Sequence, residues 1–112
     1  MSFRQEDLAE RLRRAWSSAT ATTWTAENPA KGQCSVTAIA VQRMLGGDIL
    51  KTETAEGVHF YNCINGVRYD FTSSQFTREI EYKDLRSSAE EALSDTSESQ
   101  LKSLLVALGE QP

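Results

Sequence analysis

The segment Cys34–Leu45 constrains the fold more than any other part of the chain, because it is apolar on nearly every side when wound as a helix. The residues expected to face outward are Ser35, Gln42 and Arg43. Gly46-Gly47 follows and supplies the residue type that ends a helix in a left-handed conformation. Since a helix with so little polar surface is typical of a domain centre, the sequence predicts a buried central helix.

Antiparallel strands are predicted after this helix. Three of them are expected at Asp48–Glu53, Gly57–Ile64 and Val67–Thr72. Asn65-Gly66 favours a two-residue hairpin turn, since both residues tolerate the positive φ of a type I′ turn. A fourth strand is predicted at Glu79–Lys83, with Ile80 and Tyr82 on the same face.

The N-terminal segment Phe3–Ala19 predicts an amphipathic helix, because its apolar residues recur at helical spacing. Ser2 and Gln5 have the spacing of a capping box, which marks a helix start. Asn28–Gly32 is expected to be an irregular loop, since Pro and Gly both interrupt regular structure. This loop leads the chain to Cys34.

The C-terminal segment predicts a second amphipathic helix before Gly109. Ser97 and Gln100 repeat the capping-box spacing. The apolar face of this helix comprises Leu101, Leu104, Leu105 and Leu108. The polar stretch Ser87–Ser99 is expected to be a solvated connector, with a short helix at Ala89–Leu93.

These elements predict one α+β domain over residues 1–112, with the central helix packed on a small antiparallel sheet and terminal helices flanking it. No apolar run approaches the roughly 20 residues of a membrane span, and the N-terminus lacks a signal-peptide layout. We therefore expect a soluble cytoplasmic protein without a membrane partner. The net charge of −4 disfavours nucleic acid as a partner, because phosphates repel such a surface.

The hairpin turn brings two titratable side chains together. A two-residue turn puts Ile64 opposite Val67, which sets Tyr61 opposite Asp70. Because side chains alternate along a strand, His59 and Tyr61 share one face with Asp70. Diagonal neighbours have Cβ atoms about 7 Å apart or less, a gap that an imidazole and a carboxylate can bridge with a hydrogen bond.

Cys34 adds a nucleophile to this pair, because a helix N-terminus stabilises a thiolate through its dipole and its unpaired N–H groups. Cys34, His59 and Asp70 have the residue types of a nucleophile, a base and an orienting acid. Either Gln33 or Asn28 is a candidate to help the Cys34 backbone N–H stabilise an oxyanion. Each residue alone is more often an ordinary packed side chain, so the prediction depends on their joint occurrence.

Cys63 provides a competing interpretation. It lies about 13 Å along the strand from His59, so a Cys34–Cys63 disulfide and a Cys34–His59 pair exclude each other. The same separation argues against a zinc site, because zinc ligands lie about 2.0 to 2.3 Å from one centre. No metal and no cofactor are expected. The aromatic residues, Trp24 and Tyr61 among them, are interpreted as core and as the wall of a cleft.

Three short segments resemble the core of the transglutaminase-like branch of the papain-like cysteine peptidases. They are Gly32–Ala38, Gly57–Asn62 and Tyr69–Thr72. That family places Cys at a helix start, His two positions before an aromatic residue, and Asp after a hairpin. By this resemblance Cys34, His59 and Asp70 match the catalytic positions, and Tyr61 takes the place of the aromatic residue. Asn28 stands six residues before the cysteine, at the position of the oxyanion-hole Gln of papain-like peptidases.

A broader set of residues resembles the YunG-like family of small bacterial proteins, a family that brings no established activity with it. The set comprises Trp16, Trp24, Asn28-Pro29-Ala30, Gly32-Gln33-Cys34, Thr37-Ala38, Gln42, Gly46-Gly47, His59, Asn62, Asp70, Thr72 and Gln75-Phe76. This pattern covers most of the chain.

The leading hypothesis is a small cysteine hydrolase or acyltransferase, in which Cys34 attacks an amide or thioester of an unidentified acyl or peptide substrate. The main alternative is a non-catalytic domain that uses the cleft of the same fold to hold a peptide or a partner surface. A third alternative is a thiol redox switch formed by Cys34 and Cys63. The oligomeric state is not predicted.

Overall fold

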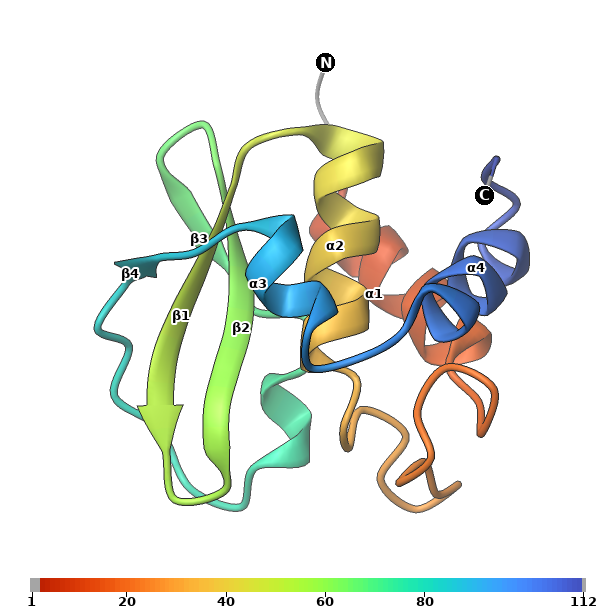
Figure 1. Ribbon diagram of the computed structural model, residues 1–112, viewed down its shortest axis with the longest axis horizontal. Coiled ribbons are helices and arrows are strands. Elements are labelled where there is room, and N and C mark those ends of the chain that lie inside the picture. The colour runs from red at the N-terminus through yellow and green to blue at the C-terminus, as the bar shows by residue number, and fades with distance from the viewer. Residues whose placement is uncertain (1–2, 112) are drawn as a thin grey trace.

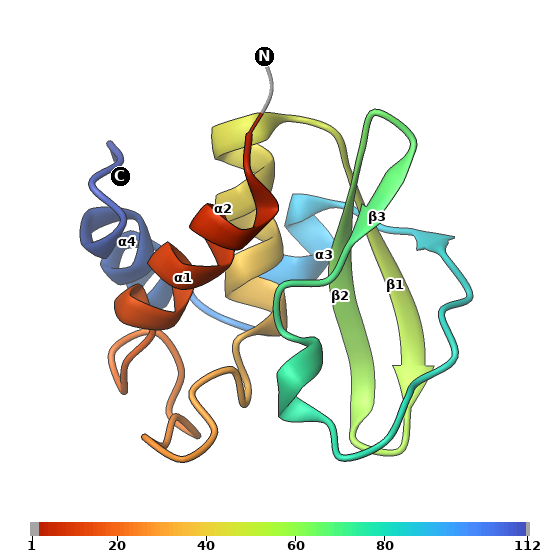
Figure 2. The same ribbon diagram turned by 180° about the vertical axis from the view of Figure 1, so that it is seen from behind.

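Helix α2 (Cys34–Leu45) forms the centre of the molecule, with the sheet on one side and two other helices on the opposite side (Figure 1, Figure 2). The computed structural model describes residues 3–111. Eight consecutive residues of α2 are buried, beginning with Cys34. Gly46 ends the helix with φ +79°. The predicted central helix is therefore confirmed, with its predicted bounds. The expectation that Ser35 faces outward is wrong, since Ser35 is only 1% exposed.

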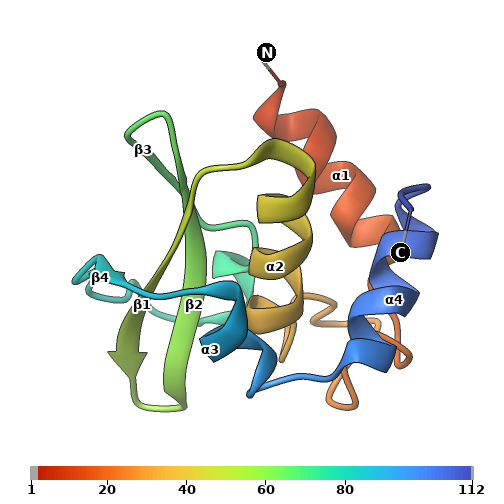
Figure 3. The ribbon, with the colours of Figure 1, turned by 45° about the horizontal axis from the view of Figure 1, so that its top comes forward.

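Helices α1 (Gln5–Ala15) and α4 (Glu98–Ala107) cover the face of α2 that points away from the sheet, as the tilted view also shows (Figure 3). They share one buried cluster with α2 and β2, which includes Leu12, Leu104 and Ile39. The arrangement is α+β, as predicted. No helix among residues 3–111 combines the length and apolar character needed to cross a membrane.

The sheet has four antiparallel strands in the order β3-β2-β1-β4. Their bounds are β1 (Asp48–Thr54), β2 (Gly57–Ile64), β3 (Val67–Tyr69) and β4 (Leu85–Arg86). Asn65 and Gly66 have φ +53° and +78°, as a type I′ turn requires. Ile64 pairs with Val67, so the predicted hairpin register is confirmed.

The N-terminal helix is shorter than the predicted Phe3–Ala19. It begins at Gln5 and ends at Ala15, because Trp16 leaves the helix with extended backbone angles of φ −63° and ψ 139°. The Trp16 indole is buried and donates a hydrogen bond of 2.9 Å to the Thr37 hydroxyl of α2. This tertiary contact overrides the helical spacing of the following residues. The capping box at Ser2 lies outside the described residues.

The predicted fourth strand at Glu79–Lys83 is wrong. That segment is irregular, and the short strand β4 forms two residues later and pairs with β1. The buried hydroxyl of Thr52 in β1 donates to the Glu81 carbonyl at 2.7 Å and accepts from the Lys83 N–H at 3.2 Å. A side chain thus supplies the hydrogen bonds that a strand ladder would have supplied.

Two further boundaries differ from the prediction. The strand predicted at Val67–Thr72 ends at Tyr69, because the chain turns at Asp70. The stretch Ser87–Ser99 is not a fully solvated connector, since helix α3 (Ala89–Leu93) forms where the sequence predicts it and packs on α2. Its Ala92 is fully buried. The capping box that starts α4 is confirmed by a hydrogen bond from the Gln100 N–H to the Ser97 hydroxyl.

Candidate active site

Cys34 is the first residue of α2, and the loop before it fixes this position. Gly32 has φ +76°, and a Cβ atom there would lie 2.0 Å from the Thr23 hydroxyl oxygen, so the position requires glycine. Gln33 precedes the helix and is fully buried, and its side-chain oxygen accepts a hydrogen bond from Thr20 at 2.8 Å. Only 9% of Cys34 is exposed. The thiol therefore lies at a helix N-terminus with little solvent around it.

His59 and Asp70 make the contact that the hairpin register predicts. His59 Nε2 lies 2.7 Å from Asp70 Oδ2. The two side chains are only 2% and 6% exposed, respectively. His59 belongs to β2, whereas Asp70 follows directly after the end of β3. The pair is thus held between a regular strand and the start of an irregular segment.

Asp70 accepts hydrogen bonds at both carboxylate oxygens. The Thr72 N–H donates to Oδ1 at 3.1 Å, and the Tyr82 hydroxyl donates to Oδ2 at 2.7 Å. Burial raises the pKa of Asp70. The hydrogen bond and charge of His59 lower this pKa, as do the hydrogen bonds from Tyr82 and Thr72, and the net pKa lies below its ordinary value. Asp70 is therefore a buried carboxylate that keeps its charge.

The environment of His59 favours its protonated form. Burial lowers the pKa of the imidazole, but hydrogen bonding and charge from Asp70 and Cys34 outweigh burial and raise the pKa to about 9. Nδ1 is buried and has no hydrogen-bond partner among the described residues. The imidazole thus contacts Asp70 directly and shares one cavity with Cys34.

Aromatic rings enclose the imidazole on two sides. The Tyr61 ring stacks on it at 5.9 Å between centroids, and the edge of Phe76 meets it at 4.8 Å. Tyr61 is itself buried, and its hydroxyl donates to Asp84 Oδ1 at 3.0 Å and accepts from the Asp84 N–H at 2.8 Å. Burial and the Asp84 hydrogen bond raise the pKa of Tyr61 to about 12, so its hydroxyl stays protonated.

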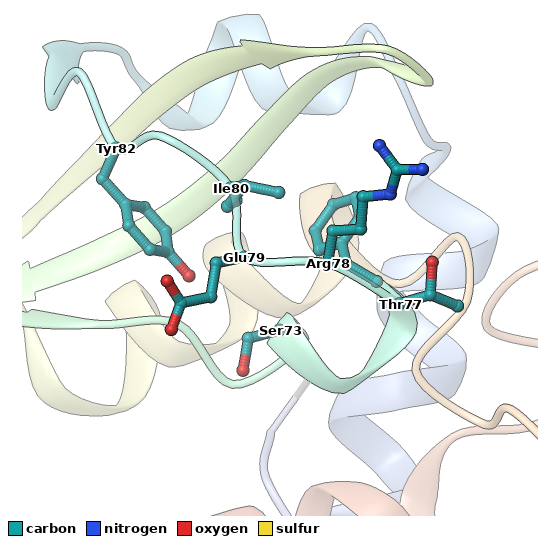
Figure 4. Close-up of a pocket in the computed structure, with 7 residues that line it drawn as sticks. Ser73, Thr77, Arg78, Glu79, Ile80 and Tyr82 are labelled. Atoms are coloured by element: carbon teal, nitrogen blue, oxygen red, sulfur yellow. The ribbon is translucent and has the colours of Figure 1, made fainter.

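A cavity of about 290 Å³ opens at this site. Its lining includes Cys34, His59, Gln75 and Phe76. A larger cavity of about 650 Å³ also has Phe76 in its lining, but neither Cys34 nor His59 contributes to it. Figure 4 shows this larger cavity, with Tyr82 on the opposite side from Thr77 and Arg78. The smaller cavity is therefore the candidate site, because both Cys34 and His59 line it.

The other residues singled out in the sequence lie around the site rather than in the cavity. Gln33 and Asn28 do not line it, and the Asn28 side-chain amide donates instead to the Gln75 carbonyl at 3.3 Å. Trp24 packs against the core.

Both cysteines are free, and Cys63 pairs in register with Arg68 at the turn end of β2. Within residues 3–111 no group of three or more His, Cys, Asp or Glu side chains is placed to hold a metal ion.

Tyr82, Gln75 and Phe76 are among the residues of the site that were not singled out as site residues from the sequence. Tyr82 was predicted on a strand, and no local pattern connects it with Asp70, which is twelve residues earlier. Gln75 lies in a short 3-10 helix (Ser73–Gln75) that has no apolar periodicity of its own. The one available signal for Gln75 was its membership in the broader family resemblance.

Comparison with known proteins places the chain in a family. The family described as YunG protein matches residues 4–111. The Bacillus subtilis (strain 168) protein named "Uncharacterized protein YunG" is 52% identical over 93 residues, which cover 83% of this chain and 81% of that protein. No solved structure matches significantly. The chain therefore belongs to the YunG family.

Proposed function

We propose that this protein is a cysteine hydrolase or acyltransferase that acts on an amide or thioester through Cys34, His59 and Asp70. The observation that carries the proposal is the position of the buried imidazole. One ring nitrogen lies 2.7 Å from the Asp70 carboxylate, and the imidazole lines the same cavity as Cys34. A nucleophile, a base and an orienting acid are the groups that acyl transfer requires.

Each group has a defined part in the proposed reaction. Before the reaction His59 already holds the proton of the pair, so Cys34 attacks as the thiolate. The sulfur forms a bond to the carbonyl carbon while the C=O electron pair moves to oxygen. Collapse of this intermediate breaks the bond to the leaving nitrogen or sulfur, which takes the proton from His59. Water or another acceptor then bonds to the acyl carbon and gives its proton to His59, while the carbon–sulfur bond breaks and restores the Cys34 thiolate. Asp70 keeps the imidazole oriented throughout.

Two features support this reaction over simple packing of the three residues. The raised pKa of His59 keeps the imidazole protonated at neutral pH, and an imidazolium stabilises a neighbouring thiolate. The cavity gives a small molecule access to a thiol that is otherwise nearly buried. The resemblance of the three short segments to the papain-like and transglutaminase-like core agrees with the same assignment of roles.

Competition between the two cysteines tests the proposal. Cys63 is more exposed than Cys34, so accessibility alone predicts that iodoacetamide modifies Cys63 first. We expect the opposite at pH 6, with Cys34 modified at least about tenfold faster, because thiolate rather than thiol is the nucleophile. Peptide mass spectrometry after timed quenching gives both rates in one sample.

Two variants serve as controls for this experiment. His59→Gln is expected to slow the modification of Cys34 without changing that of Cys63. Cys63→Ser is expected to leave the Cys34 rate unchanged. Equal, slow modification of both thiols in the parent chain would contradict an enzyme and would favour a domain that binds a partner without catalysis.

A further inference from the structure

Gln75 carries a buried hydrogen-bond donor at the candidate active site. Its side-chain nitrogen Nε2 is inaccessible to solvent and has no hydrogen-bond partner among the described residues. Gln75 lines the same cavity as Cys34 and His59. An unpaired buried donor costs about 1 to 3 kcal/mol, so a ligand that supplies an acceptor to this nitrogen would offset that cost.

Contacts with the loop before α2 hold the Gln75 amide in place. The Gly32 N–H donates to the Gln75 side-chain oxygen at 3.4 Å, and the Asn28 side chain donates to the Gln75 backbone carbonyl at 3.3 Å. These contacts occupy the acceptors of Gln75 and leave its NH₂ group as the unpaired end. Because Gly32 is two residues before Cys34, the same loop positions both the amide and the thiol.

The two residues proposed from the sequence as oxyanion donors are less suitable. Asn28 already uses its side-chain NH₂ group on Gln75 and does not line the cavity. Gln33 also has an unpaired Nε2, but it is fully buried and absent from the lining of the cavity. Trp24 has an unpaired indole N–H and is likewise absent from that lining. Gln75 alone among these combines an unpaired donor with a place in the cavity.

We infer that Gln75 Nε2 and the backbone N–H of Cys34 together bind the carbonyl oxygen of the acyl group that Cys34 attacks. The Cys34 N–H is available because the first N–H groups of a helix have no intrahelical acceptor. When sulfur bonds to the carbonyl carbon, the oxygen takes the electron pair, and both donors stabilise its negative charge. This inference rests on the proposed function, and it assigns the carbonyl-binding role to a residue of the 3-10 helix.

Two reagents separate this role from a structural one. Acylation of Cys34 by p-nitrophenyl acetate passes through an oxyanion, whereas alkylation by iodoacetamide displaces iodide at a saturated carbon and forms none. The full chain with Cys63→Ser is used throughout, so that Cys34 is the one thiol present. Release of p-nitrophenolate and mass spectrometry give the two rates.

Gln75→Met keeps the length of the side chain and removes its donor. We expect it to lower the acylation rate at least about tenfold and to change the alkylation rate less than about twofold, since loss of one oxyanion donor costs about 10² to 10³ in rate in established cases. Gln75→Glu retains an acceptor for the Gly32 N–H and is expected to lower the ratio of the two rates as well. Ser74→Ala, an exposed neighbour in the same 3-10 helix, is the matched control and is expected to keep the parental ratio.

The remaining outcomes are equally decisive. If both rates fall together in Gln75→Met, the residue supports the fold and the inference is overturned. If neither rate changes, Gln75 does not contact the carbonyl and the inference is overturned while the proposed function stands. If parental Cys34 reacts with neither reagent, the proposed function fails, and the inference fails with it.

Discussion

Two regions of the molecule hold the candidate active site, and they are stabilised by different forces. Helix α2 and strand β2 provide Cys34 and His59, and both elements are packed into the main hydrophobic cluster. The segment from Asp70 to Asp84 provides Asp70 and two of the groups that bond to it, yet it is almost free of regular structure. Side-chain hydrogen bonds hold this segment, as at Thr52 and at Tyr82.

The two regions therefore differ in how their side chains are held in position. Apolar packing holds the elements that carry Cys34 and His59 through many contacts, so the loss of one contact is spread over a cluster. The irregular segment depends on a few polar bonds, each of which positions one group. We therefore expect core substitutions to cause the largest losses of stability, and substitutions in the segment to cause smaller losses, each through one polar bond.

Ile39→Ala should have the largest effect on stability. Ile39 is 2% exposed at the centre of α2, and truncation of a buried Ile to Ala costs about 2 to 5 kcal/mol through lost transfer free energy and a residual cavity. Urea denaturation followed by circular dichroism measures the free energy of unfolding. A loss below about 1 kcal/mol would show that α2 is not the packed centre of the molecule.

The next largest effect should come from pH. The pKa of His59 is raised from 6.5 to about 9 in the folded chain, so the folded state binds this proton more tightly than the unfolded state. The resulting stabilisation is fully present below about pH 6.5 and is lost as the pH rises through about 9. Urea midpoints at pH 6 and pH 9.5 should differ more in the parent chain than in His59→Gln. Equal differences in the two chains would contradict this linkage.

Tyr82→Phe tests the irregular segment from Asp70 to Asp84, and the expected loss of stability is smaller. It removes the 2.7 Å hydrogen bond to the Asp70 carboxylate, and bonds to charged groups contribute about 1.5 to 3 kcal/mol. We expect a loss of about 2 kcal/mol at pH 7, measured as above. Tyr69→Phe is the control, because no hydrogen bond of the Tyr69 hydroxyl is found within the described part of the chain, and it should cost less than about 0.5 kcal/mol. Equal losses in the two variants would show that Tyr82 does not act through Asp70.

The smallest effect should come from an exposed polar contact. Glu10 on α1 bonds to Arg13 at 3.2 Å and to Arg14 at 3.1 Å, and its side chain is 48% exposed. Exposed ion pairs contribute about 0.2 to 1 kcal/mol, so Glu10→Gln should cost no more than about 0.5 kcal/mol. A cost as large as that of Tyr82→Phe would remove the distinction between buried and exposed polar bonds.

The same two regions differ in how well the sequence predicts them. The bounds of α2 follow from its composition, and the His59–Asp70 contact follows from the Asn65-Gly66 turn, because a short turn fixes the register of the residues beside it. The positions of Tyr82 and Gln75 do not follow from any periodic pattern, since the segment that carries them is held by hydrogen bonds to distant side chains. Trp16 shows the same limit, because its bond to Thr37 ends α1 before the helical spacing does.

Titration of the imidazole by NMR tests most directly whether Cys34, His59 and Asp70 form one coupled unit. His59 is the only histidine in the chain, so its ring gives one unambiguous set of signals. We expect a midpoint near pH 9 in the parent chain, and a shift of that midpoint toward 6.5 in both Cys34→Ser and Asp70→Asn. A parental midpoint at or below 6.5 would contradict this coupling, because the effect of burial on the pKa of His59 would then outweigh the effects of Asp70 and Cys34.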